Sequence, residues 1–125
     1  MSGVIDLVTG VFEAGKTSFI KKLIENEAIV SYKNILIINT EFGIESYSDF
    51  SIEGSNITIV DILKEEDFNQ DRINMEIKDL DPDYVLIEYN GMWDLESILG
   101  MKFIGGYYIK NLINIVDYRT WKPLW

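Results

Sequence analysis

The residues best suited to chemistry lie near the start of the chain, where Gly10 to Thr17 read G-V-F-E-A-G-K-T. They match the pattern G-x-x-x-x-G-K-[ST], whose glycines let the backbone wrap around an anion and direct its N–H groups at phosphate oxygens. In that arrangement Lys16 can set its ammonium beside the β- and γ-phosphates of a nucleotide, and the Thr17 hydroxyl can bind a Mg²⁺ ion that bridges the same oxygens. The pattern predicts a phosphate-binding loop, and an ordinary glycine-rich turn between a strand and a helix is the structural alternative.

The segments on either side of this loop have the character that such a loop needs. Residues 4–8 form a short, mostly apolar run that is typical of a strand. After the loop, apolar residues recur with helical spacing from Phe19 to Ile24, so an amphipathic helix of about three turns is expected there. Thr17 opens that helix, whose free N–H groups and dipole favour negative charge. Asp6 is a mismatch within the first strand: it is tolerable near a solvated strand end, whereas an unpaired buried charge would be costly.

The remaining apolar segments predict the rest of an α/β fold. Strands are expected over residues 35–38, 57–62, 84–87 and 112–116. A helix is expected over 65–80, stopped by the Asp81-Pro82-Asp83 turn, and a short helix near Trp93 or Asp94. Strands that alternate with helices indicate a mostly parallel sheet with helices on both faces, of the P-loop NTPase type, in a single domain over residues 1–125.

Polar residues follow most of the expected strands. They are Thr9 and Gly10, residues 39–41, residues 88–91, and Asp117. In an open parallel sheet the carboxyl ends of the strands meet at one edge, and ligands bind beyond that edge. The sequence therefore predicts that these groups share one rim, although a packing or structural role is expected for Asp117 and for the tryptophans.

The composition limits the chemistry and the partners. The 125 residues carry a net charge of −10, and an overall negative field disfavours nucleic acid or an anionic membrane as a partner. The chain has no Cys and no His, which excludes thiolate zinc sites, disulfides and histidine acid–base chemistry within it. No apolar stretch approaches the length of a membrane span, and the N-terminus does not read as a signal peptide, so the cytoplasm is the expected location.

Three motifs, taken in order, resemble the G3E family of P-loop GTPases, which includes the CobW-like cobalamin-synthesis proteins and the nickel-insertion GTPases of hydrogenase and urease. Residues 8–18, V-T-G-V-F-E-A-G-K-T-S, are similar to T-G-F-L-G-A-G-K-T-T of that family. Residues 37–44, I-I-N-T-E-F-G-I, resemble the CobW-type segment N-E-F-G-E, and residues 85–91, V-L-I-E-Y-N-G, resemble I-E-T-T-G. Residues 112–117 are similar to a strand that ends V-V-D-A, so the resemblance spans nearly the whole chain.

The resemblance implies a Mg²⁺-dependent domain that binds and hydrolyses GTP, with ATP as an open alternative. The nucleotide-binding positions that it implies are Gly10, Val11, Phe12, Glu13, Ala14, Gly15, Lys16, Thr17, Ser18 and Gly91. Thr17 and Glu88 would be the magnesium ligands, and Lys16 and Glu88 the catalytic groups. Glu41, Phe42 and Gly43 would form a switch loop, and the Gly91 N–H would lie near the γ-phosphate, so that loss of that phosphate releases the following loop. The alternatives are a solvated strand-end carboxylate for Glu88 and an ordinary turn for Glu41 and Gly43.

The chain departs from the family in four ways. Glu13 stands where the family has glycine, which adds negative charge beside the expected anion. The Cys-x-Cys-Cys element of CobW-type members is absent, so metal delivery by that route is not assigned. Ile44 replaces an acid, and the N-K-x-D motif that reads guanine is not in the sequence. The missing N-K-x-D motif indicates the N-terminal part of a longer domain. The partners that the resemblance suggests are a client metalloprotein or corrinoid-related protein, or a second copy in a homodimer.

Two other functions compete with a GTP-hydrolysing switch. The first is a degenerate member that binds nucleotide without turnover and serves as an interaction module, an interpretation prompted by Glu13 and the missing motifs. The second is a small ATP-dependent kinase that uses the same loop; it is disfavoured because Arg72 and Arg119 are the only arginines, too few for an arginine-rich lid.

Overall fold

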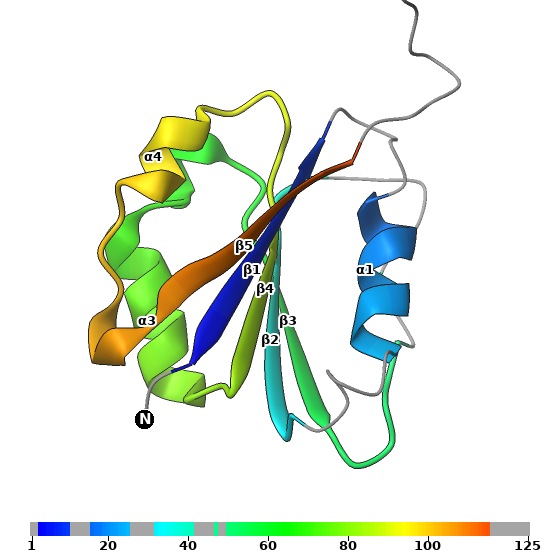
Figure 1. Ribbon diagram of the computed structural model, residues 1–125. Coiled ribbons are helices and arrows are strands. Elements are labelled where there is room, and N and C mark those ends of the chain that lie inside the picture. Colours follow the sequence, from blue (N-terminus) through cyan, green and yellow to red (C-terminus); the bar gives the residue numbers. More distant parts are fainter. Residues whose placement is uncertain (1–2, 11–15, 26–31, 42–46, 48–49, 116–125) are drawn as a thin grey trace, which may run out of the picture.

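The computed structural model describes residues 3–10, 16–25, 32–41, 47 and 50–115. Five strands lie in these ranges: β1 (Val4–Gly10), β2 (Asn34–Asn39), β3 (Asn56–Asp61), β4 (Tyr84–Glu88) and β5 (Tyr108–Ile115). The helices of the same ranges are α1 (Lys16–Glu25), α3 (Gln70–Leu80) and α4 (Leu95–Leu99), with 3₁₀ turns η1 (Glu65–Asp67) and η2 (Ile104–Gly106) (Figure 1). None of these helices has the length and apolar character needed to cross a bilayer.

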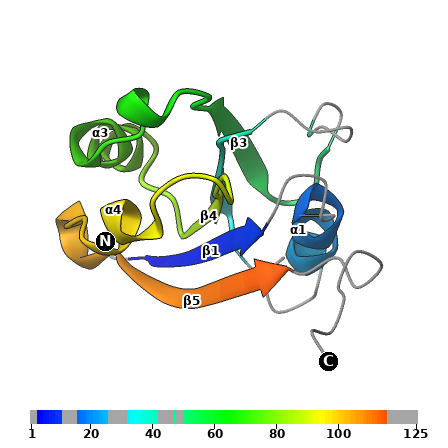
Figure 2. The same cartoon turned by 90° about the horizontal axis from the view of Figure 1, so that it is seen from above.

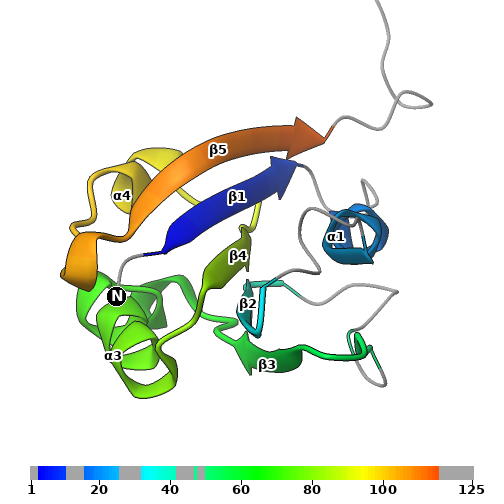
Figure 3. The same ribbon diagram turned by 60° about the horizontal axis from the view of Figure 1, so that its bottom comes forward.

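The five strands form one sheet in the order β3-β2-β4-β1-β5, and every neighbouring pair is parallel (Figure 3). The α/β fold class predicted from the sequence is confirmed, and the sheet of the described residues is wholly rather than mostly parallel. The order places β4 between β1 and β2, so the strand that ends at Glu88 lies beside the strand that leads into the glycine-rich segment. In register, Val8 of β1 is opposite Glu88 of β4.

Helices cover both faces of the sheet, as the sequence predicts. Helix α1 lies on one face, and α3 and α4 lie on the other (Figures 1 and 2). Side chains alternate between the two layers: in β4, Val85 and Ile87 join the α3 and α4 layer, while Tyr84 and Leu86 join the layer that contains Ile20 and Ile24 of α1. This two-sided burial explains why β2 and β4 are unbroken apolar runs in the sequence.

The starts of two expected elements differ from the structure by four or five residues, and the bounds of the other strands by one or two. The helix expected over 65–80 begins only at Gln70, because the Asn69 side chain accepts a hydrogen bond from Arg72 N at 2.9 Å and caps it, with the η1 turn preceding it. It ends as expected, with Asp81 in the left-handed region at φ 44°. The last strand, expected from residue 112, already begins at Tyr108, since an edge strand pairs through its backbone and needs no continuous apolar run. The short helix is confirmed, with Asp94 as its N-cap.

Asp6 is neither near solvent nor unpaired, which corrects both readings of it from the sequence. Its side chain is buried, yet it accepts hydrogen bonds from the Tyr84 hydroxyl at 2.6 Å and from Asn111 Nδ2 at 2.8 Å. Burial, followed by the hydrogen bond and the charge of Asp6, raises the pKa of Tyr84. The strands on either side of β1 thus supply the polar partners that this carboxylate requires.

Candidate functional site

The carboxyl ends of β1, β2 and β4 lie at one edge of the sheet, and α1 begins at the same edge (Figure 1). Backbone contacts join these ends directly. Thr40, which follows β2, donates from its N–H and its hydroxyl to the Glu88 carbonyl oxygen, at 3.1 and 2.7 Å. Tyr89 N donates to the Val8 carbonyl oxygen at 2.7 Å. The rim predicted from the sequence therefore exists for Gly10, residues 39–41 and Glu88.

Lys16 is buried at this rim and is held by two oxygen acceptors. Its ammonium donates to the Gly10 carbonyl oxygen at 2.7 Å and forms an ion pair with Glu41 Oε1 at 2.5 Å. Both side chains of the pair are almost inaccessible, with 2% of Lys16 and 7% of Glu41 exposed. The first residue of α1 thus turns its charge inward toward the strand ends rather than outward into solvent.

Thr17 and Glu88 lie 71 residues apart in the chain and form a direct hydrogen bond at the rim. The Thr17 hydroxyl lies 2.9 Å from Glu88 Oε1 and 3.1 Å from Oε2. Tyr47 donates its own hydroxyl to Glu88 Oε1 at 2.7 Å. All three side chains are buried, so the carboxylate receives its hydrogen bonds from the protein.

Burial raises the pKa of the Glu88 carboxyl above its usual value. The hydroxyls of Tyr47 and Thr17 lower it, the negative charge of Glu41 raises it, and the positive charge of Lys16 lowers it. Burial outweighs the stabilising contacts, so an additional positive charge near Glu88 would favour its ionised form.

Gly10 is required by the sheet as well as by the motif. Its φ of +154° is one that side-chain-bearing residues rarely adopt, and a Cβ atom there would lie 2.5 Å from the Ile115 carbonyl oxygen. The neighbouring strand β5 therefore leaves no room for a side chain. This close approach explains the glycine without any ligand, so Gly10 alone does not distinguish a phosphate-binding loop from a structural turn.

Gly91 lies at the same rim, shortly after the end of β4. It is exposed and lines a cavity of about 330 Å³ together with Gly10, Thr9, Trp93, Leu95, Leu112 and Asn114. Asn90 just before it is fixed to the rim, because its N–H donates to the Thr40 hydroxyl at 2.7 Å. Trp93 also packs against the rings of Phe68 and Tyr89, which confirms the packing role expected for it.

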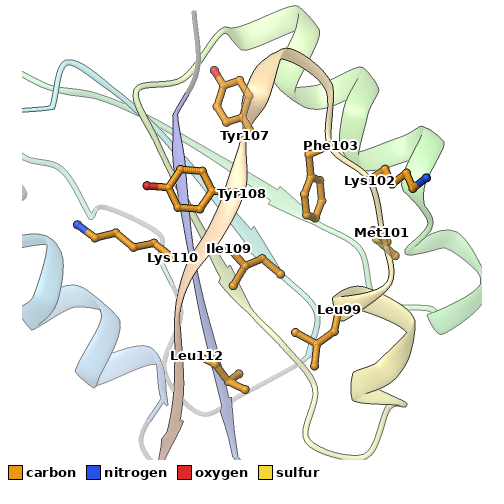
Figure 4. A pocket seen from close by; sticks show the side chains of 9 residues that line it. All are labelled: Leu99, Met101, Lys102, Phe103, Tyr107, Tyr108, Ile109, Lys110 and Leu112. Atoms are coloured by element: carbon orange, nitrogen blue, oxygen red, sulfur yellow. The ribbon is translucent and has the colours of Figure 1, made fainter.

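A larger cavity, of about 630 Å³, shares only Leu112 with the lining of the smaller one (Figure 4). It is bounded by β5 and by the segment between α4 and β5, with the side chains of Leu99, Phe103, Ile109 and Leu112 among its walls. The Tyr107 hydroxyl there donates to the Pro82 carbonyl oxygen at 2.6 Å, a contact within the fold. None of the site residues predicted from the sequence lines this cavity.

Several predicted positions lie outside the described residues. They are Val11, Phe12, Glu13, Ala14, Gly15, Phe42, Gly43 and Asp117. Ser18 is described, partly buried in the first turn of α1. The described part of the site is therefore Lys16, Thr17, Glu41 and Glu88, with Gly10 and Gly91 beside them.

Sequence reasoning missed Tyr47 as a member of the site and gave Thr40 no role. Tyr47 stands in a polar segment without periodicity, so no pattern in the sequence marks it. Thr40 lies directly after a buried strand, and its position on the predicted rim was the available signal. Its hydroxyl links Glu88 to Asn90 by accepting from one backbone group and donating to the other.

The donor set at Thr17 and Glu88 fits a magnesium ion. Mg²⁺ prefers oxygen ligands, is commonly held by one or two protein groups together with substrate phosphates, and binds at about 2.0–2.1 Å. The 2.9 Å between Thr17 Oγ1 and Glu88 Oε1 is close to the separation of two neighbouring ligands in such an octahedral shell. The described residues contain no group of three or more His, Cys, Asp or Glu side chains that could enclose a metal by themselves. The arrangement thus suits a metal that is shared with a ligand.

No protein-family model, curated protein or solved structure matches this chain.

Proposed function

We propose that this chain is a Mg²⁺-dependent nucleotide-binding domain of a CobW-like G3E GTPase, and that it binds and hydrolyses GTP. One observation carries the proposal: the Thr17 hydroxyl is hydrogen-bonded to the Glu88 carboxylate across 71 residues of sequence, beside the buried Lys16. The two residues come from two separate motifs of the resemblance. Their contact supports the pairing that a shared magnesium site requires.

Each described side chain has a distinct part in this proposal. Lys16 would offer its ammonium to the β- and γ-phosphates, and the first turn of α1 would contribute the positive end of the helix dipole. Thr17 and Glu88 would hold the Mg²⁺, which would supply positive charge beside the phosphates. Tyr47 and Thr40 would keep Glu88 in place, from its side chain and from its backbone.

Hydrolysis in this class of site depends on positioning and on stabilising charge. Because Lys16 and its neighbours at the rim are buried, the interaction of its charge with a phosphoryl group would be stronger than in water. Gly91, which lines a cavity together with Gly10, would offer its N–H near the γ-phosphate. The preference for guanine and the client metalloprotein or corrinoid-related partner follow from the resemblance and stay predictions.

The test is nucleotide-dependent melting. A millimolar ligand at a micromolar site stabilises a fold by roughly 4 kcal/mol, so GTP or GDP with Mg²⁺ should raise the Tm clearly, while ATP and ADP report the base preference. Lys16→Ala should lose this rise. Lys22→Ala, which removes an exposed lysine from the same helix, should keep it. If none of the four nucleotides moves the Tm of the wild type, the proposal is wrong.

A nucleotide-binding module without turnover is the second candidate. The pairing of Lys16 with Glu41 favours it, because the described site already satisfies its own charges. Steady release of phosphate from GTP, abolished in Lys16→Ala, would exclude this candidate. Nucleotide-dependent melting without any phosphate release would support it.

A further inference from the structure

The Glu41 carboxylate lies where a phosphate ligand would interact with Lys16. The ion pair is 2.5 Å long and buried on both sides, with 2% of Lys16 and 7% of Glu41 exposed. Lys16 is the residue that the glycine-rich pattern assigns to the phosphate chain. An anion from the protein itself therefore interacts with the charge that an anionic ligand would need.

The position of Glu41 is determined by its neighbours. Thr40 is tied to the Glu88 carbonyl oxygen by two hydrogen bonds, and Glu41 N lies 3.5 Å from Asn39 Oδ1. These contacts hold the backbone at the end of β2 and bring the next carboxylate over the start of α1. The ion pair is a consequence of where β2 ends.

Stability alone does not account for this pair. Removing two charges from water has a high desolvation cost, and a buried ion pair often contributes no more to stability than well-packed apolar side chains would. Because the desolvation cost of this pair is high, the position of the Glu41 carboxylate is better explained by a function of Lys16 than by stability.

We propose that Glu41 is an internal competitor for phosphate at Lys16, so that a nucleotide binds by exchanging its phosphate oxygens for this carboxylate. The inference rests on the proposed function, since it concerns the same site. No covalent bond changes: the Lys16 ammonium keeps its proton and trades one anionic acceptor for another.

The proposed exchange predicts which ligands compete with Glu41. Every ligand that places a phosphate on Lys16 must displace Glu41 and meets the same cost. A ligand that does not reach Lys16 meets none. Glu41 therefore weakens the binding of nucleotides with at least two phosphates and of free anions that bind at Lys16, and it leaves the binding of a nucleoside monophosphate unchanged.

The test compares Glu41→Gln with Asp61→Asn. Both substitutions remove one negative charge at the carboxyl edge of the sheet, but Asp61 is exposed and accepts a hydrogen bond from Asn39 Nδ2 at 3.1 Å rather than pairing with a lysine. Kd values would be measured by calorimetry for GTP, GDP and GMP with Mg²⁺. Hydrogen bonds to charged groups contribute enough that Glu41→Gln should tighten GTP and GDP binding by roughly ten- to a hundredfold. GMP binding should not change, and Asp61→Asn should change each Kd less than about twofold.

Glu41→Ala gives an independent readout and covers the case in which the glutamine variant does not fold. Formate can refill the place of the missing carboxylate, so it should weaken GDP binding to Glu41→Ala, whereas chloride at the same ionic strength should not. Circular dichroism checks that each variant is folded.

The outcomes separate the two proposals. If the wild type binds GTP but Glu41→Gln binds it equally or more weakly, the competitor role is wrong and the proposed function stands. An equal gain in Asp61→Asn would also overturn the competitor role, because it would reduce the effect to net charge. Failure of the wild type and of both Glu41 variants to bind any nucleotide overturns both proposals.

Discussion

Removal of the Tyr47 hydroxyl tests how much the buried Glu88 carboxylate depends on the hydrogen bonds that it accepts. This hydroxyl lies 2.7 Å from Glu88 Oε1, the oxygen that Thr17 approaches to 2.9 Å. Tyr47→Phe removes that donor while keeping the ring, which packs at 6.2 Å from the Phe50 ring. The variant therefore removes the hydrogen bond to the buried carboxylate and leaves the aromatic ring in place.

The magnitude follows from the burial of Glu88, of which only 3% is exposed. Water cannot replace the lost donor easily there, and hydrogen bonds to charged groups contribute about 1.5–3 kcal/mol. Tyr47→Phe should therefore lower the free energy of unfolding by about 2 kcal/mol. For a domain of this size that corresponds to a fall in Tm of roughly 5–10 °C.

The assay is urea unfolding at pH 7.5, with Tyr108→Phe as the control, because the Tyr108 side chain is 54% exposed and should tolerate the change. Thr17→Val and the double variant complete a double-mutant cycle. Since both hydroxyls serve one carboxylate, the two losses should not add and should differ from additivity by at least about 0.5 kcal/mol. A loss in Tyr47→Phe no greater than that in Tyr108→Phe, or strict additivity, would refute the shared contact at Glu88.

Further predictions concern the strand end and the buried phenols. Gly10→Ala should lower the free energy of unfolding in urea by well over 1 kcal/mol. Gly54→Ala should lower it less, because Gly54 is also at positive φ but an added Cβ there has nothing within 4 Å. Equal losses would contradict the clash with Ile115. Burial raises the pKa of Tyr89 to about 12 and also raises that of Tyr84. The folded chain then binds more protons than the unfolded one above pH 10, so stability should fall as pH rises from 10 towards 12. Absorbance at 295 nm should show folded tyrosines ionising later than unfolded ones, and Tyr84→Phe should reduce the loss of stability.

Much of the fold could be predicted because its central strands, β1, β2 and β4, are buried on both faces. The runs at Ile35 to Ile38 and Tyr84 to Ile87 are continuous and apolar, which distinguishes a parallel sheet covered by helices from one with a solvated face. The boundaries were harder. Asn69 shortens one expected helix by a cap that depends on a single side-chain oxygen, and β5 extends through Lys110 and Asn111 because pairing with β1 needs only its backbone.

The rim could be predicted, but the contacts within it could not. The rule that parallel strands end at a common edge brings Gly10 and Glu88 together without knowledge of the strand order. The two hydrogen-bond partners of Asp6 could not be found in this way. Tyr84 and Asn111 lie 78 and 105 residues away in the chain, and they are near Asp6 because β1 lies between β4 and β5. Tyr47 depends on the path of a segment between strands, for which periodicity carries no information.

The negative charge of the chain bears directly on how the proposed ligand would be accepted. With a net charge of −10, the molecule as a whole repels a nucleotide, and the attraction must come from a few local groups.

If Lys16 were unpaired in the absence of ligand, it would be a buried charge without compensation, at a cost of several kcal/mol. Pairing with Glu41 offsets part of that cost, and the proposed exchange of carboxylate for phosphate preserves an anionic partner for the Lys16 ammonium when the ligand arrives. The displaced carboxylate would then move toward solvent, where it is best hydrated, so the energy of binding would depend on the difference between two anions at one lysine. On this reasoning the acidic composition and the phosphate-binding pattern are compatible, and Glu41→Gln measures that difference directly.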